Sequence, residues 1–151
     1  MENLWGGFKP KRIETPNSIL ETAIKQLKII SNKVVYAELN ELKITPFDLI
    51  KSYKFNFDFS IKSKYLESYS FRAFSVHYDI IAYPLNLKID SSIKEDIKDK
   101  LIEFKKDITS NIIIIDNENE FIEILKTILQ SKRMEEIINT LYSVSKENIQ
   151  F

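Results

Sequence analysis

The chain has 151 residues, of which 44% are hydrophobic, 12% aromatic and 29% charged, and its 22 basic residues balance 22 acidic ones. Two glycines and four prolines are too few for a collagen-like or low-complexity chain, so the composition predicts a folded protein. The sequence contains no cysteine, which excludes disulfides, thiolate metal sites and a cysteine nucleophile. A net charge of zero weighs against broad nucleic-acid binding, which needs a basic field.

The length favours one domain built around one hydrophobic core. We expect residues 1–16 to form an irregular N-terminal arm and residues 17–151 to form a single domain. The arm lacks the apolar stretch of a signal peptide, and the longest wholly apolar run, 112–115, is far too short to span a membrane. These features predict a cytoplasmic protein, and the excess of isoleucine and of lysine over arginine is typical of AT-rich bacterial genomes.

The first regular element that the pattern predicts is a helix over residues 18–31. Ser18 and Glu21 have the spacing of a capping box, in which the two side chains satisfy backbone amides at the start of a helix. Apolar residues then recur at helical spacing, which predicts one face turned toward the core. The residues on this expected inner face are Leu20, Ala23, Ile24, Leu27 and Ile30.

Four strands are expected in the middle of the chain, over residues 34–43, 54–62, 69–78 and 80–89, with Thr45 and Pro46 ending the first. In the second of them phenylalanines alternate with polar residues, which is typical of a strand with one buried face. A proline inside the fourth indicates an edge position or a bend. Because the strands contain almost no glycine, tight two-residue hairpins are not predicted.

Helices dominate the last third of the sequence. A second capping-box spacing at Ser92 predicts a helix over 92–106, and a short β-branched run over 111–116 predicts a buried strand. Asn117 and Ser131 then precede two further helical patterns, each as an expected N-cap. The order α-β-β-β-β-α-β-α-α predicts an α+β fold, in which helices cover one face of a mostly antiparallel sheet of four to five strands.

His77 is the one histidine in the sequence, so histidine-based acid–base chemistry would require it. On a strand that continues to Asp79, the two side chains lie on the same face, and the carboxylate would orient the ring and raise its basicity. This pair would serve an enzyme or a small-ligand binder with a sheet-lined pocket. The more common alternative is an edge histidine beside an unrelated acid. Because no nucleophile elbow accompanies His77, we favour a protein without enzymatic activity.

No pattern in the sequence predicts a metal or a cofactor. The acidic residues over 116–123 resemble a calcium loop superficially, but Phe121 occupies the position where an EF-hand needs glycine. Acidic residues at the start of a helix are also explained by the helix dipole. Phosphate-binding loops and dinucleotide fingerprints need spaced glycines, and the two glycines of this chain are adjacent.

Basic residues flank the aromatic strands, as in sheets that stack single-stranded bases. These residues are Lys54, Lys62, Lys64 and Arg72. The alternation of Phe55, Phe57 and Phe59 with polar residues favours packing in a core instead. Single-stranded nucleic-acid binding therefore remains a third hypothesis.

Aromatic residues outside the predicted core are candidates for contact with another protein. Trp5 and Phe8 stand in the N-terminal arm, where they either anchor a partner or pack back on the protein's own core. Tyr65 and Tyr69 bracket a predicted connection between strands, a common place for partner contacts. By elimination and from its size, the chain is expected to be a small protein-binding module, of an immunity, antitoxin or chaperone-like kind.

Overall fold

The computed structural model describes residues 1–43 and 53–149, and its elements follow the predicted order, which confirms the α+β class. Thr45 and Pro46, expected to end the first strand, lie outside the described residues. The elements are α1 (Pro16–Ile30), β1 (Val35–Glu41), β2 (Phe55–Ser63), β3 (Leu66–Tyr78), β4 (Leu85–Ile89), α2 (Ser91–Glu103), β5 (Ile113–Ile115), α3 (Glu118–Leu129) and α4 (Lys132–Ile149).

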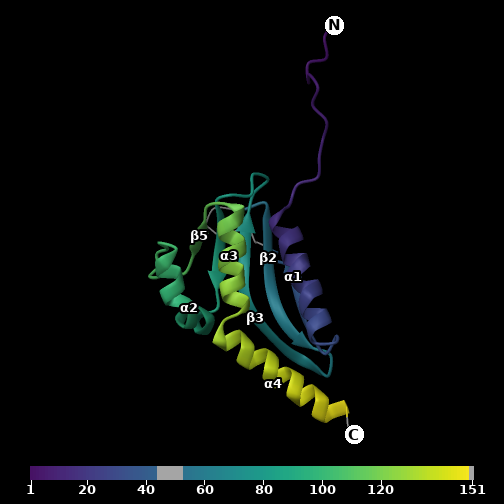
Figure 1. Cartoon of the computed structure of the whole chain (residues 1–151), viewed down its shortest axis with the longest axis vertical. Helices are drawn as coiled ribbons and strands as arrows, with labels where there is room; N and C mark the ends of the chain where they lie inside the picture. The colour runs from purple at the N-terminus through teal and green to yellow at the C-terminus, as the bar shows by residue number, and fades with distance from the viewer. Residues whose placement is uncertain (44–52, 150–151) are drawn as a thin grey trace.

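The five strands form one sheet in the order β1-β2-β3-β4-β5, and every neighbouring pair is antiparallel. In Figure 1, α1, α3 and α4 lie over one face of this sheet, while α2 lies to the side, where it contacts α3 and α4. The polar face of the central strands, which carries Asn56, Asp58, Ser75 and His77, is turned away from these helices. The fold therefore has two layers, with the core between the helices and the sheet.

Aromatic side chains from adjacent strands form the centre of the core. Phe59 and Phe74 stack with ring centroids 4.8 Å apart, and each is only 1% exposed. Phe121 of α3 is also fully buried, while Phe55 and Phe57 pack against the core from its edge. The alternating phenylalanines of β2 therefore belong to the core, as expected from their spacing.

Two helices begin earlier than the sequence pattern predicts. The capping box of α1 is formed by Thr15 and Ser18: the Thr15 hydroxyl accepts from the Ser18 amide at 3.1 Å, and the Ser18 hydroxyl accepts from the Thr15 amide at 2.8 Å. Pro16 then stands at the first helical position, where its missing N–H costs nothing. In α2, the cap is Asp90, whose carboxylate accepts from the amide of Ser92 at 2.9 Å.

The other two predicted caps are confirmed. The Asn117 side chain accepts a hydrogen bond from the Glu120 amide at 2.9 Å at the start of α3. The Ser131 hydroxyl accepts from the Met134 amide at 3.2 Å at the start of α4. In both helices, the residue that the sequence predicts as the N-cap is the one whose side chain accepts the backbone hydrogen bond.

The expected inner face of α1 is wrong at its last residue, because Ile30 is 80% exposed. At 100° per residue, Ile30 lies roughly 80° away from Leu20 around the helix axis. Leu20 is fully buried, and α1 packs mainly on β1 at the edge of the sheet, so it covers only a narrow strip. Ile30 is also the last residue of the helix, whereas Ile19, at a similar angle near its start, packs against the core.

The strand boundaries differ from prediction at one hairpin and at one proline. β2 and β3 are joined by a two-residue turn at Lys64 and Tyr65, and β3 begins at Leu66, within the stretch expected to be a connection. The turn is held from outside the hairpin, because the Lys64 amide donates to the Val34 carbonyl at 3.0 Å. β4 begins only after Pro84, which follows a cis peptide bond.

Candidate functional site

The N-terminal arm, residues 1–15, contains no helix or strand and projects away from the domain (Figure 1). Trp5 is 79% exposed and Phe8 is 68% exposed. A tight turn orders the tip: the Gly6 amide donates to the Asn3 carbonyl at 3.0 Å, and the Phe8 amide donates to the Trp5 carbonyl at 3.2 Å. Gly6 has a φ of 62°, a left-handed conformation that glycine adopts without strain.

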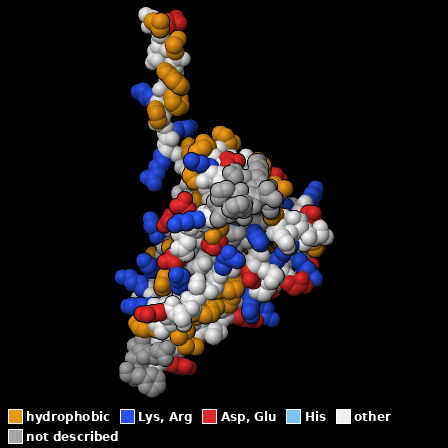
Figure 2. All heavy atoms as spheres, turned by 180° about the vertical axis from the view of Figure 1, so that it is seen from behind, with side chains coloured by type: hydrophobic (Ala, Val, Ile, Leu, Met, Phe, Trp, Pro, Cys, Tyr) orange, Lys and Arg blue, Asp and Glu red, His pale blue; other side chains and the backbone are white. Residues whose placement is uncertain are grey.

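Of the two alternatives for the arm, the structure has the exposed one. The arm stands clear of the domain, with hydrophobic side chains along it (Figure 2). Pro10 and Pro16 also keep the residues before them extended, which directs the chain away from the domain. The two aromatic side chains of the arm are left in solvent.

Further exposed apolar residues lie at the same end of the molecule, in the connection between β3 and β4 (Figure 1). Ile80 and Ile81 of this connection are 74% and 81% exposed. Asp79 holds its start in place, because its carboxylate accepts from the Lys54 amide at 2.9 Å. We call these residues together the arm-end surface: Leu4, Trp5, Phe8, Ile13, Ile80 and Ile81.

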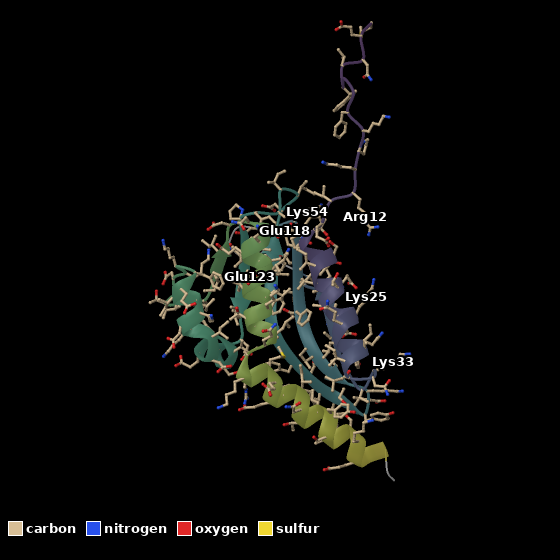
Figure 3. The ribbon with its side chains drawn as sticks, viewed as in Figure 1. Arg12, Lys25, Lys33, Lys54, Glu118 and Glu123 are labelled. Atoms are coloured by element: carbon tan, nitrogen blue, oxygen red, sulfur yellow. The ribbon has the colours of Figure 1, made fainter. Side chains whose placement is uncertain are left out.

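Positive charge accompanies this surface. Lys9, Lys11 and Arg12 lie between Phe8 and the start of α1, and each is exposed. Figure 3 shows Arg12 at the base of the arm and Lys54 at the same end of the domain. The arm-end surface therefore combines exposed aromatic and aliphatic side chains with a local excess of cations.

His77 lies on the polar face of the sheet and has partners other than the predicted one. Its Nδ1 lies 2.7 Å from Oδ1 of Asn56, and its Nε2 lies 3.3 Å from the Ser75 hydroxyl. The Asn56 amide group donates to the Tyr53 carbonyl at 2.8 Å, which fixes its Oδ1 toward the ring. Asp79 instead accepts from a backbone amide, so the structure does not join His77 and Asp79 by a hydrogen bond.

Burial favours the neutral form of His77. Burial lowers its pKa, Asp58 opposes this effect, and Lys88 adds to it. With Nδ1 donating to Asn56, Nε2 accepts from Ser75, a connectivity shared with nucleophile–base–orienter sites. Ser75, however, is buried and paired with strands on both sides, in contrast to the sharp, exposed turn that a nucleophilic serine occupies. The cluster therefore fits a structural role on the sheet better than catalysis.

The two tyrosines predicted as an interface have different surroundings. Tyr65 is in the β2–β3 turn, where it is partly exposed and the Lys64 ammonium lies 5.6 Å from its ring centroid. Tyr69 is half-buried and packs against the core, near Leu141 of α4. They lie at the end of the domain opposite the arm, in a short hairpin rather than in a loop.

Several of the charged residues considered as candidate binding residues form ion pairs within the protein. Lys62 pairs with Glu38 at 2.7 Å, and Arg72 contacts Asp58 at 3.4 Å, so part of the basic flank of the strands is neutralised. In the acidic run, Asp116 and Glu120 both pair with Lys106. Within the described residues, no group of three acidic, histidine or cysteine side chains is placed to hold a metal ion.

Sequence reasoning missed Asn56 and Ser75, the actual partners of His77. Asn56 is 21 residues away in the sequence and meets His77 only because β2 pairs with β3 in this register. The available signal was the strand pattern itself, since matching the buried faces of two neighbouring strands would have placed Asn56 opposite His77.

Comparison with protein-family models, with curated proteins and with solved structures finds no match to this chain. Among the residues that the structure describes, no helix combines the length and the hydrophobicity needed to cross a membrane.

Proposed function

We propose that this protein is a binding module that captures a partner protein with its N-terminal arm. The observation that carries the proposal is the exposure of Trp5 and Phe8 on an arm that makes its hydrogen bonds within itself. Moving a large aromatic side chain from water into an apolar environment is favourable in free energy. Such side chains are also among the residue types most often found as anchors of interfaces. The arm-end surface offers such anchors together with exposed isoleucines of the domain.

The chemistry of this surface suggests the chemistry of the partner. Lys9, Lys11 and Arg12 form a run without an intervening acid, so the partner should carry an apolar cleft with an acidic rim. The turn at Gly6 holds Trp5 and Phe8 in a fixed relation, which reduces the ordering entropy that binding must overcome. A small domain bearing such an arm is suited to occlude a site on its partner.

These features favour a neutralising role of the immunity or antitoxin kind, or a chaperone-like role, in the cytoplasm of a bacterial cell. It rests on the size of the protein and on the arm rather than on a catalytic group. The polar cluster around His77 has no part in it, so His77→Ala should leave partner binding unchanged. Loss of binding in that variant would favour the alternative, a ligand site on the sheet.

The test is capture from cells of the source organism, followed by isothermal titration with the purified partner. The variants are Trp5→Ala with Phe8→Ala, and a matched control, Ile29→Ala with Ile30→Ala, which removes two equally exposed apolar side chains from the other end of α1. We expect the arm variant to lose at least tenfold in affinity and the control to bind as the unaltered protein does.

Two results would contradict the proposal. One is a partner that the arm variant still binds with unchanged affinity, because the anchors would then be irrelevant. The other is capture that disappears after nuclease treatment and falls steeply with added salt, since this behaviour would identify a nucleic acid as the ligand.

A further inference from the structure

A groove of about 450 Å³ lies between α2, the middle of β3 and the end of β4, away from the arm-end surface. This volume is in the range of small-molecule binding sites. Side chains that can donate hydrogen bonds to an anion line it from three directions: β3, the end of β4 with the start of α2, and the segment before β5. They are Arg72, Lys88, Ser91, Lys94, Lys98 and Asn111. We call this the cationic groove.

The acidic residues in the groove do not balance its basic ones. Asp90 is engaged at the start of α2, where its carboxylate accepts from the Ser92 amide. Glu95 pairs with Lys98 at 2.9 Å, so these two charges offset each other. The Asp90 carboxylate keeps its charge, so the lining carries four basic side chains against two acidic ones.

Three cations remain. Arg72 contacts Asp58 at 3.4 Å, but the guanidinium remains largely exposed. The Lys94 ammonium donates to the Ser110 carbonyl at 2.5 Å, a neutral acceptor, and its charge adds to the hydrogen bonds that lower the pKa of Asp107. Lys88 is exposed and has no ion-pair partner within the described part of the chain. A ligand in the groove would thus meet an excess of basic over acidic side chains, contributed by the sheet and by α2.

We propose that the cationic groove binds a small polyvalent anion, a molecule that carries phosphate or carboxylate groups between Lys88 and Arg72 on the sheet and Lys94 on α2. A ligand with one negative charge would compete poorly with salt ions at so open a surface. A ligand with two or more negative charges can accept hydrogen bonds from several donors at once. The site is independent of the protein-binding function proposed for the arm.

A small anion fits the surroundings better than a nucleic acid does. A long polyanion needs a continuous basic track, but the neighbouring cation on the sheet, Lys62, is neutralised by Glu38 at 2.7 Å. The net charge of the chain is zero, so the groove has no broad basic field around it of the kind that nucleic-acid binding needs. The floor of the groove is formed by buried side chains such as Phe74 and Ile89, which limits its depth to that of a compact ligand.

The test is isothermal titration of the full chain with inorganic pyrophosphate and, in a separate series, with citrate, at low ionic strength. Lys88→Gln is the principal variant, because Lys88 is exposed and its loss should leave the fold intact. Lys25→Gln is the matched control: it removes the same charge from an exposed position on α1, far from α2 (Figure 3). Thermal unfolding followed by circular dichroism checks that both variants are folded.

We expect saturable binding of one anion, weakened about tenfold or more by Lys88→Gln and unchanged by Lys25→Gln. Preference for pyrophosphate over citrate would identify phosphate chemistry, and the reverse would identify a carboxylate ligand. The absence of saturable binding of either anion would overturn the proposal. Equal weakening by both variants would also overturn it, because binding would then depend only on the overall charge of the protein. Tighter binding of a single-stranded oligonucleotide than of either anion, lost in Lys88→Gln, would overturn it as well.

Discussion

Two regions of this chain, the arm and the paired strands β2 and β3, carry aromatic residues in opposite environments. In β2 and β3, Phe59 and Phe74 are buried and stacked on each other. In the arm, Trp5 and Phe8 are exposed and contact solvent. The strands bury their rings because neighbouring strands and helices surround them, whereas glycine and proline interrupt the arm and no strand pairs with it. Aromatic content alone therefore does not indicate burial.

The two environments imply two uses of the same kind of side chain. Burial of a large aromatic ring in the core contributes to the free energy of folding. The rings of the arm contribute almost nothing to that free energy, so their hydrophobic surface remains available for a partner. The clearest tests of this difference are substitutions that affect the stability of the domain strongly in one region and barely in the other.

The largest effect is expected for Phe74→Ala. Because Phe74 is 1% exposed and stacks on Phe59, its truncation leaves a cavity and should lower the free energy of unfolding by about 3–5 kcal/mol. Urea denaturation followed by far-ultraviolet circular dichroism measures the change. Phe8→Ala serves as the control, and a loss of similar size in that variant would mean that the arm packs on the domain.

A smaller effect is expected at Thr15, where the arm ends and the domain begins. Thr15→Ala removes the cap of α1 and should cost about 1 kcal/mol of unfolding free energy. Thr22→Ala is a matched control, since it makes the same change within the same helix, where alanine is the better helix former. If Thr22→Ala destabilised the protein as much as Thr15→Ala, the boundary would not be set by this cap.

The cap also illustrates how far the sequence predicts the structure. Periodicity predicted every element in order, because each buried face repeats in a local pattern. The starts of α1 and α2 were placed too late, because Thr15 and Asp90 compete with Ser18 and Ser92, which have equally plausible spacing. In α1, Pro16 is the signal that favours Thr15, because proline is preferred at the first helical position.

The partners of His77 and the exposure of the arm were harder to predict, for a different physical reason. Both depend on contacts between residues that are distant in the sequence. Asn56 meets His77 through the register of two strands, and the exposure of Trp5 depends on whether the arm contacts the domain. Local spacing, such as that of His77 and Asp79, favours neighbours in the sequence and misses such partners.

Tyr83 lies between the two environments and is expected to show an intermediate effect. Its ring packs against the core, but its hydroxyl is buried without a hydrogen-bond partner among the described residues. Tyr83→Phe removes this hydroxyl, so at neutral pH the variant should be as stable as the unaltered protein or more stable by up to about 1 kcal/mol. A clear loss of stability in denaturant would show that the hydroxyl has a partner.

The same residue predicts a dependence on alkaline pH. Burial, followed by the nearby Glu118 and Tyr78, raises the pKa of Tyr83 from 10.0 to about 12. A raised pKa in the folded state means that stability is intact below pH 10 and declines as the pH rises from 10 toward 12. The decline should be smaller in Tyr83→Phe than in Tyr65→Phe, which alters an exposed hydroxyl. Equal declines would contradict the assignment.

The smallest change in stability is expected for Trp5→Ala, within about 0.5 kcal/mol of the unaltered protein. Trp5 is the only tryptophan of the chain, so the intrinsic fluorescence reports on the arm alone. Its emission should be that of an indole in water and should not shift when urea unfolds the domain, while circular dichroism records the transition. Addition of the partner should move the emission to shorter wavelength. An emission that is already at short wavelength in the isolated protein, and that shifts on unfolding, would place the ring against the domain and remove the difference between the arm and the strands.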